Sequence, residues 1–541
     1  MRAAMAASAL VLCLVGCELF EKKPDSPTTD PAPITTSVSA PVVTSSPAPV
    51  VSLVPAPPEP VPEPAPEPAP EPAPEPAPAP TPVPEPEPTP TPPASEPIST
   101  PAPVFSELFV PGADSRVVYV SSSGGNDSNN GLSEAKAKKT IAAGVALLRN
   151  GSPDFLLLKR GDVWDEAFGS WKKFGRSASE PMVIWSYGLS LKRPMLRTGS
   201  KMAILTDPRG GTPELLHSLV FSGLHFYAHT RDQYSSNFTG VAGAPGVHWL
   251  RHSKDITFDD CMFQAYHNGM NVQDFDQKGV TRFALRRCVF IDSYPSEQGV
   301  HAQGIYVSGV TTLLIEDCVF DRNGWGELAE TTDNPTIYNH NLYLQYNNAL
   351  DVVVRRNIIC RASSHGIQLR SGGVIENNLF FRNPINIQCG YDTPVPGATA
   401  DVLNNVVLEG NDIAPNLPRG WGLNFKNMVL ARVERNIVAH HDSAKVNRRS
   451  IEVWPFVTYA DNIVYDWPVG STGRGWGETL ETPGPWKDPN RSIAKYCGSL
   501  GLPANVQTFY AKIRAQSRAE FDPRFTTEAI NRYFVEGFQR P

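Results

Sequence analysis

A short pattern recurs eight times between residues 258 and 465, and it constrains the fold more than any other feature of the chain. Each copy holds an apolar run, a polar pair and a second apolar run, and successive copies lie 21 to 40 residues apart. Such a unit has no helical period and cannot bury its apolar face alone, so it must stack on its neighbours. The copies are FDDCMF (258–263), LRRCVF (285–290), IEDCVF (315–320), VRRNIIC (354–360), IENNLFF (375–381), VLNNVVL (402–408), VERNIVA (433–439) and YADNIVY (459–465).

A second motif alternates with the first, once per repeat. Together the two motifs resemble the right-handed parallel β-helix of the pectate-lyase-like superfamily, over about residues 116–467. The resemblance implies an all-β, right-handed parallel β-helix solenoid, a fold that hosts many activities. The second motif reads HNGMNVQ (267–273), AQGIYVSG (302–309), HNLYLQ (340–345), HGIQLRSGG (365–373), NIQCG (386–390), WGLNFKN (421–427) and SIEVW (450–454).

Both ends of the repeat region have their own patterns. Residues 118–151 resemble the superfamily's first segment, with a strand, a Gly/Asn-rich loop and an amphipathic capping helix at about 140–149 that would cover the first open rung. Residues 488–541 turn helical in pattern, which favours a cap on the other end. The predicted domains are a lipoprotein signal peptide (1–16), a disordered linker (17–104), the N-terminal cap and first coils (105–215), the β-helix repeats (216–467) and a C-terminal helical extension (468–541).

The N-terminus resembles a bacterial lipoprotein signal. An apolar run from Ala6 to Gly16 is too short to span a bilayer, and it ends in Leu14-Val15-Gly16-Cys17. The resemblance implies cleavage before Cys17 and lipidation of its thiol, and Glu18 favours the outer membrane. We therefore expect an exported protein that contacts the membrane only through its lipid anchor, at the bacterial outer membrane or cell surface.

Proline and charge separate a stalk from the globular part. Of the 53 prolines, 31 lie between residues 24 and 103, where alternate prolines preclude a packed core and favour extended polyproline II. Residues 104–541 hold 45 basic and 43 acidic side chains, a net charge of +2, so the acidity of the chain belongs to residues 1–103. A near-neutral globular part gives no electrostatic case for nucleic acid.

Alternate residues of the second motif predict an inward apolar set and an outward polar ladder, because alternate strand residues face opposite ways. The ladder is Asn271, Tyr306, Tyr343, Gln368, Gln388, Asn424 and Glu452. Two positions later come Gln273, Ser308, Gln345, Arg370, Gly390, Lys426 and Trp454, and three positions before it stand Asn268, Gln303, His340 and His365. Trp249 and Trp325, in long insertions, and Trp421 are expected near this face. Solvated surface is the alternative interpretation of such a ladder.

The first motif predicts structural columns. We align Cys261, Cys288 and Cys318 with Ile358 and the later apolar residues, as stacked free thiols that face inward. A second column, Asn357, Asn378, Asn405, Asn436 and Asn462, is expected to bond from rung to rung, with Asp260 and Asp317 as members. No metal-ligand spacing of Cys and His is present, so no metal site is predicted.

The ladder favours one reaction class. Glycoside hydrolysis needs two carboxylates, and the ladder offers only Glu452. His, Tyr, Arg, Lys and Gln suit uronate polysaccharide lyases or C5 epimerases, in which one group neutralises the carboxylate, a base removes the C5 proton and an acid protonates the leaving oxygen. The predicted catalytic residues are Arg370 for the carboxylate, His340 or His365 as base, and Tyr343 as acid or second base. The predicted substrate-binding residues are Gln303, Tyr306, Gln345, Gln368, Lys426 (a weaker candidate base) and Trp421.

The alternative is a non-catalytic module that binds polysaccharide, as a scaffold or an adhesin. In both interpretations the expected partner is an anionic polysaccharide and the expected state is a monomer. The sequence indicates no cofactor and leaves calcium open.

Overall fold

The computed structural model describes residues 109–541, apart from 208, 210–214, 298–299, 327–335, 350, 411–418, 441–448 and 468–481. These residues belong to one compact unit, 95–541. The predicted signal peptide, the lipidation at Cys17 and the linker to residue 104 lie outside the described residues. No described helix is long and apolar enough to span a membrane.

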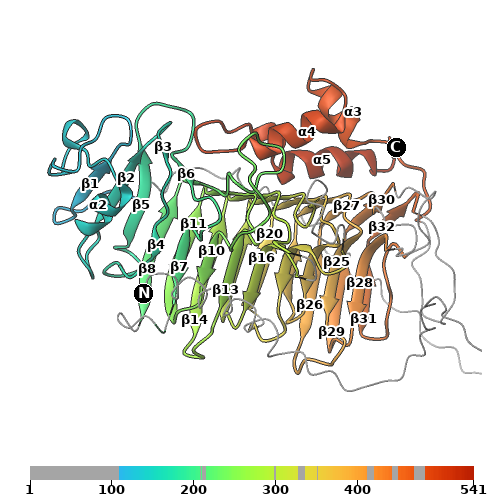
Figure 1. The fold of residues 1–541 in the computed structure, drawn as a ribbon. Helices are drawn as coiled ribbons and strands as arrows, with labels where there is room; N and C mark the ends of the chain where they lie inside the picture. Colours follow the sequence, from blue (N-terminus) through green and yellow to red (C-terminus); the bar gives the residue numbers. More distant parts are fainter. Residues whose placement is uncertain are drawn as a thin grey trace, which may run out of the picture. The chain divides into compact units, whose positions relative to one another are not determined.

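The described chain winds into a parallel β-helix, as predicted, with each complete coil adding one strand to each of three parallel sheets (Figure 1). Sheet A is β1 (Val117–Val120), β2 (Phe155–Lys159), β5 (Met182–Tyr187), β8 (Leu216–Ser222), β11 (Ser253–Asp259), β14 (Val280–Arg286), β17 (Thr312–Glu316), β20 (Asp351–Arg355), β23 (Gly373–Glu376), β26 (Thr399–Leu403), β29 (Leu430–Glu434) and β31 (Val457–Ala460). Sheet B is β3 (Val163–Trp164), β6 (Met195–Arg197), β9 (His225–Tyr227), β12 (Met262–Gln264), β15 (Val289–Ile291), β18 (Val319–Asp321), β21 (Ile358–Cys360), β24 (Leu379–Phe381), β27 (Val406–Leu408), β30 (Ile437–Ala439) and β32 (Ile463–Tyr465). Sheet C is β4 (Gly169–Ser170), β7 (Ile204–Thr206), β10 (Val247–Trp249), β13 (Met270–Gln273), β16 (Gln303–Ser308), β19 (His340–Leu344), β22 (His365–Leu369), β25 (Ile385–Gly390) and β28 (Trp421–Lys426).

The interior of the coil is a column of stacked apolar side chains. Phe226, Phe263, Phe290 and Phe320 stack on successive rungs with ring centroids 4.7 to 5.1 Å apart. Trp249 belongs to this core, where it packs edge-on against Phe258 and is fully buried, so its predicted place beside a groove is wrong. A tryptophan on a strand next to apolar neighbours buries more area inside the coil than it would on a groove wall.

A ladder of buried asparagines lines the corner between sheets A and B, as predicted. From Asn378 onward each asparagine side chain accepts from both the backbone and the side-chain amide of the asparagine one rung earlier, as Asn405 Oδ1 does from Asn378 N and Nδ2, both at 3.0 Å. Rungs therefore bond through side chains where the strands themselves are interrupted.

The predicted alignment of the cysteines with this ladder is wrong by one residue. The strand register pairs Val319 with Ile358, so Cys318 shares a column with Asn357, whose Oδ1 accepts the Cys318 backbone N–H at 2.9 Å. Asp260 and Asp317 therefore precede the asparagine column and stand in its neighbour, where φ is positive, near 55°. The sequence pattern did not reveal this shift, because it does not distinguish a buried asparagine from an exposed polar residue. Cys261, Cys288 and Cys318 are buried and free, as expected, and so are Cys360, Cys389 and Cys497.

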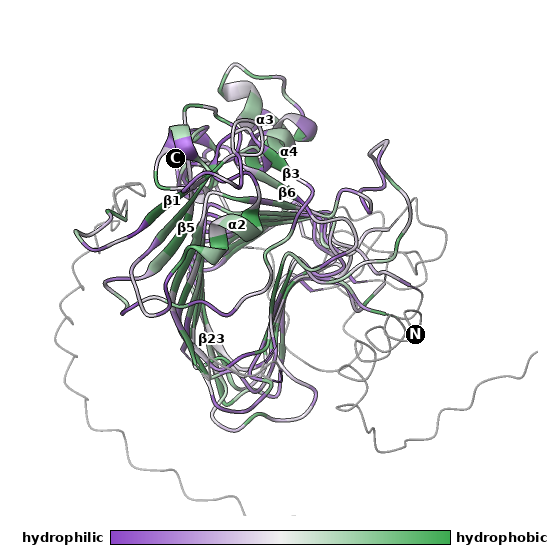
Figure 2. Cartoon of the chain, turned by 60° about the vertical axis from the view of Figure 1, so that its left-hand side comes forward, coloured by the Kyte–Doolittle hydropathy of each residue, from purple (hydrophilic) through white to green (hydrophobic). Residues whose placement is uncertain are grey.

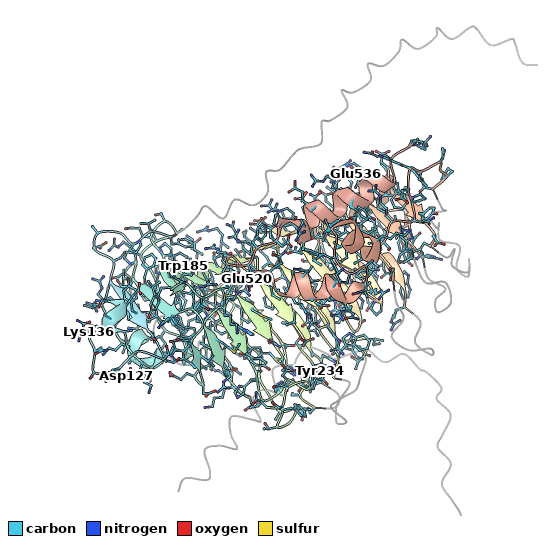
Figure 3. The ribbon with its side chains drawn as sticks, turned by 90° about the horizontal axis from the view of Figure 1, so that it is seen from above. Asp127, Lys136, Trp185, Tyr234, Glu520 and Glu536 are labelled. Carbon is cyan, nitrogen blue, oxygen red and sulfur yellow. The ribbon has the colours of Figure 1, made fainter. Side chains whose placement is uncertain are left out.

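The N-terminal end carries the predicted capping helix, α2 (Ile141–Ala146), preceded by the short 3₁₀ helix η1 (Glu134–Lys136). Thr140 caps α2 by accepting the backbone N–H of Ala143, and Ile141 is buried in the main core. Figure 3 shows Asp127 and Lys136 at this end of the solenoid, well away from Glu536 on the C-terminal extension.

The C-terminal extension covers a flank of the solenoid and not its end, which corrects the predicted cap. It consists of α3 (Ile493–Ser499), α4 (Val506–Arg514), the 3₁₀ helix η3 (Pro523–Phe525) and α5 (Thr527–Gly537), which lie along sheet B (Figures 1 and 2). The strands of sheet B are apolar on both faces, so their outer face needs a cover. Its outer side chains, among them Ile358, Leu379 and Val406, form one buried cluster with Phe509, Ile513 and Phe534 of the helices.

Buried ion pairs fix the extension to the coil. Arg514 binds both Asp292 and Asp321, and Arg518 binds Asp259. The Arg514 guanidinium and the Asp321 carboxylate satisfy each other inside the interface, where an unpaired charge would be costly. The extension is therefore an integral layer of the domain.

Candidate functional site

The register of sheet C places the predicted ladder on one face. Tyr306 pairs with Tyr343, Tyr343 with Gln368, Gln368 with Gln388, and Gln388 with Asn424. Adjacent rungs lie about 4.8 Å apart, so neighbours in this column are in contact. The alternate residues, from Met270 and Val272 to Leu423 and Phe425, are buried in the core as expected.

Six planar groups stack in sequence across this face. The ring of His365 lies 4.5 Å from that of His340, and His340 lies 4.8 Å from Tyr343. The guanidinium carbon of Arg370 lies 4.8 Å from the Tyr343 ring and 4.2 Å from the Tyr391 ring, and Tyr391 stacks on Tyr346 at 5.4 Å. The four predicted catalytic residues therefore form one continuous stack, which two further tyrosines extend.

The hydrogen bonds of His340 fix its tautomer. Gln303 Oε1 accepts the His340 backbone N–H at 2.8 Å, so this oxygen cannot be an amide nitrogen, and it also lies 2.9 Å from His340 Nδ1. Nδ1 must then carry the proton. The Tyr338 carbonyl, which accepts from Gln303 Nε2 at 3.0 Å, is a second acceptor close to the His340 ring, and a carbonyl can bond only to the ring nitrogen that carries the proton. His340 Nε2 keeps its lone pair, with no hydrogen-bond partner among the described residues.

His365 differs from His340 because both of its ring nitrogens are engaged. Nε2 lies 2.9 Å from Gln388 Oε1, and Nδ1 lies 2.9 Å from the Ser364 hydroxyl. With Nε2 donating to Gln388, Ser364 donates to Nδ1, and no lone pair remains. The two histidines that sequence left as alternatives are therefore separated by their partners: His340 is the group able to accept a proton, and His365 supports its ring.

Both imidazoles are held in the neutral form. Burial is the first cause, since His340 is 4 % and His365 is 6 % exposed. Burial, His365 and Arg370 hold the pKa of His340 well below its usual value. Burial also lowers the pKa of His365 to about 3. The hydrogen bond that His365 donates to Gln388 opposes this shift, while the charges of Arg419 and Lys426 add to it.

Arg370 presents only its edge. Because Tyr343 and Tyr391 contact the guanidinium, its flat faces are covered, and the N–H groups point sideways. Nη1 donates to Gln345 Oε1 at 3.2 Å, and Gln345 Nε2 donates to the Tyr343 hydroxyl at 3.1 Å. Arg370 Nε is buried and has no partner among the described residues. A buried donor without a partner calls for an explanation, and a ligand that accepts from it would be one.

The other predicted substrate-binding residues lie around this stack with different roles. Gln303 holds His340, and Tyr306 packs edge-on against Tyr343 at 5.3 Å. Gln368 is buried, and its Oε1 has no partner among the described residues. Lys426 forms an ion pair with Asp392 at 2.7 Å, which makes it a poor base, and Trp421 pairs in register with Ile385, two rungs beyond His365.

Sequence reasoning missed Tyr346 and Tyr391. Tyr346 follows the HNLYLQ motif directly and Tyr391 follows NIQCG, so both lie just beyond the strands, in turns whose course the repeat does not specify. Gly390, with φ of +86°, turns the chain sharply before Tyr391. For Tyr391, the sequence signal was the glycine directly before it, which indicates a sharp turn that carries an aromatic side chain.

Carboxylates are scarce on this face of the described chain. Glu452 is 6 % exposed, bonds to Asn424 and forms an ion pair with Arg449 at 3.3 Å. Burial raises its pKa. Across the described residues, no group of three or more His, Cys, Asp or Glu side chains is placed to hold a metal ion.

Comparisons with known proteins agree with the fold. Residues 235–413 match the model of a family described as a right handed beta helix region, so the chain contains a right-handed β-helix. No curated protein matches the chain. Similar solved structures include an alginate lyase from Paenibacillus sp. str. FPU-7, with 14% identity over 60% of this chain and 94% of that one, at a TM-score of 0.33. Pectate lyase Pel9A has 17% identity over 59% of this chain and 79% of its own, at a TM-score of 0.34. PfbA, a surface adhesin of Streptococcus pneumoniae, has 12% identity over 64% of this chain and 91% of its own, at a TM-score of 0.31. At these identities and TM-scores, none of these likenesses indicates a function for this chain.

Proposed function

We propose that this chain is an exported, lipid-anchored protein whose β-helix acts on an anionic, uronate-containing polysaccharide by removing the C5 proton, as a lyase or an epimerase. One observation carries the proposal: a neutral histidine with a free Nε2 lone pair lies in the same stack as an arginine that presents only its edge. Proton abstraction next to a carboxylate needs this pair, a base and a cation that stabilises the developing charge.

The chemistry divides among three side chains. Arg370 binds the uronate carboxylate in the guanidinium plane, which is the geometry that favours bidentate pairing. His340 Nε2 takes the C5 proton. In a lyase the C5–H electron pair forms the C4=C5 double bond, the C4–O bond breaks, and the Tyr343 hydroxyl protonates the leaving oxygen. In an epimerase the C5–H electron pair is held as the enolate of the carboxylate, which Arg370 stabilises, and the Tyr343 hydroxyl gives a proton to C5 from the opposite face.

The test is a product assay with the purified full-length protein. Alginate, pectate and glycosaminoglycans are incubated with it, the far-ultraviolet absorbance of the unsaturated product is followed, and NMR reports any change in the uronate ratio. We expect one of these polymers to give one of the two products, and Arg370→Ala to abolish it. Binding without either product would replace the enzyme proposal with a non-catalytic binding module.

The lipid anchor is proposed on the sequence alone and has its own test. Cys17→Ser should move the protein from the membrane fraction to the soluble fraction of the cell, and mass spectrometry of the wild-type N-terminal peptide should show acyl chains on Cys17. An unmodified Cys17 in a membrane-free wild-type protein would contradict it.

A further inference from the structure

We infer that the exposed ring of Tyr346 is a stacking surface for a sugar, adjacent to the uronate that Arg370 would bind. The inference rests on the proposed function and adds a second contact to the same site. Tyr346 lies in the turn after β19 and is 43% exposed, the most exposed member of the stack. An exposed aromatic ring held against a buried polar site is a feature of binding surfaces.

The layers behind Tyr346 leave one aromatic face available. Tyr391 contacts Arg370 at 4.2 Å and Tyr346 at 5.4 Å, with an interplanar angle of 11° to Tyr346. Since a ring has two faces, both faces of Tyr391 are covered. Only the outer face of Tyr346 can meet a ligand, and the row of Tyr343, Arg370 and Tyr391 supports it from behind.

The position of Tyr391 is fixed by its own turn. Asn427 Nδ2 donates to the backbone carbonyls of Tyr391 and Asp392, at 3.1 and 2.7 Å, and Lys426 pairs with Asp392. Gly390 allows the turn, because a Cβ there would lie 1.8 Å from the Lys426 carbonyl oxygen. Lys426 therefore acts as a positioning residue in this interpretation, and not as a base.

The chemistry of the surface fits a pyranose ring. A sugar presents an apolar face of C–H groups that packs on an aromatic plane, while its hydroxyls stay in water. A neighbouring carboxylate would reach the Arg370 edge in the same polymer. We therefore expect Tyr346 to contribute to binding of chains longer than one sugar, and to contribute little to a single uronate.

The test measures binding by calorimetry in a His340→Ala background, which prevents turnover. The probes are single uronic acids and oligosaccharides of two to six units prepared from alginate, pectate and chondroitin. Tyr346→Ala should weaken binding of the oligosaccharides about tenfold and leave the single uronic acid unchanged. Tyr346→Trp should retain the affinity. Tyr234→Ala, at another exposed tyrosine, on the loop between β9 and β10 (Figure 3), should change nothing.

The outcomes separate this inference from the proposed function. Oligosaccharide affinity that depends on Arg370 but is the same in Tyr346→Ala would overturn the stacking surface and leave the proposed function in place. Equal weakening of single uronic acids and oligosaccharides by Tyr346→Ala would also overturn it, because the contact would then belong to the Arg370 site. Absence of binding by every probe, or binding that survives Arg370→Ala, would overturn the proposed function and this inference with it.

Discussion

At the scale of single residues, the proposed chemistry depends on two histidines that share a stack and differ in their hydrogen-bond partners. His340 donates from Nδ1 to Gln303 and keeps Nε2 free, while His365 uses both nitrogens. The difference comes from amide groups one rung away on either side. Because a neighbouring amide sets the tautomer of His340, the importance of that tautomer can be tested by substituting the neighbour.

We expect Gln303→Leu to lower kcat about 10- to 100-fold with little effect on KM, because His340 then loses the acceptor that keeps the proton on Nδ1. Steady-state kinetics on the polymer identified by the product assay would measure the change. Gln273→Leu, on the neighbouring strand and hydrogen-bonded to Asn271, is the matched control and should leave kcat unchanged. An equal loss of kcat in the two variants would show that Gln303 has no special role in setting the His340 tautomer.

The pH dependence follows from the depressed histidine pKa values. An unfolded histidine has a pKa near 6.5, and that of His365 in the folded protein is about 3, so between these values the unfolded chain binds more protons. The free energy of unfolding is therefore highest above pH 6.5 and falls as the pH drops toward 3. At pH 4.5 this one residue should reduce it by about 2–3 kcal/mol, which urea unfolding at each pH would measure.

The same shift predicts that the rate does not fall at pH 6.5. Since His340 is neutral well below that value, the acid limb of kcat/KM should have an apparent pKa clearly under 6.5. A limb at 6.5 or above would mean that the base is an ordinary, solvated histidine or another group.

At the scale of elements, the coil is stabilised by ladders that run along the axis. The asparagine ladder satisfies backbone groups at the corner between sheets A and B, and each member makes several bonds to the rungs on both sides. Removing one member leaves buried donors and acceptors unpaired on two rungs.

Asn405→Ala should lower the free energy of unfolding by about 2–4 kcal/mol, the cost of leaving several buried groups unsatisfied. Urea denaturation gives the value. Asn237→Ala, in an exposed loop, is the comparison and should stay within about 0.5 kcal/mol. A loss at Asn405 no larger than at Asn237 would show that water replaces the ladder bonds.

The C-terminal extension makes a second element-scale prediction. Phe534→Ala should reduce the free energy of unfolding by about 3–5 kcal/mol, because its side chain is fully buried in the cluster over sheet B. The adjacent Val535 is 48% exposed, so Val535→Ala should have an effect below about 0.5 kcal/mol. Similar small effects in both variants would mean that the extension is only loosely attached.

Sequence periodicity predicts the elements far better than their environments. The repeat identifies the coil, its inward residues and the outward ladder of sheet C, because these follow from alternation along a strand. It places Cys318 and Asp317 one residue out of register, and it puts the helices at the end of the solenoid. Both errors concern contacts between segments that are far apart in sequence: the register between rungs, and the packing of the helices on sheet B. The apolar triplets of sheet B, such as Val406–Leu408, did carry the signal for a covered face.

The candidate site shows the same division. His340, Tyr343, His365 and Arg370 were predicted to converge, and the register brings them into one stack. The roles of the two histidines depend on amide orientations and hydrogen bonds that no spacing encodes. Tyr346 and Tyr391 lie in turns, where the repeat fixes no direction for a side chain.

At the scale of the described domain, the solenoid has one polar face and one covered face. Sheet B is buried beneath the helices, and sheet C presents the stack from His365 to Tyr346. A polymer can lie along such a face without a closed pocket, since successive rungs repeat the same outward positions at about 4.8 Å. Under the proposed function, the polymer would contact sheet C, while the extension covers sheet B.

The most direct test of the central claim compares wild type with His340→Ala on the polymer that the protein binds. Calorimetry measures the affinity, and ultraviolet absorbance and NMR measure the product. We predict that His340→Ala binds the polymer with nearly unchanged affinity and forms unsaturated or epimerised uronate about 100 to 10,000 times more slowly. His365→Asn should lose much less. Product formation by His340→Ala at the wild-type rate, or a new reducing end without a double bond, would contradict the account.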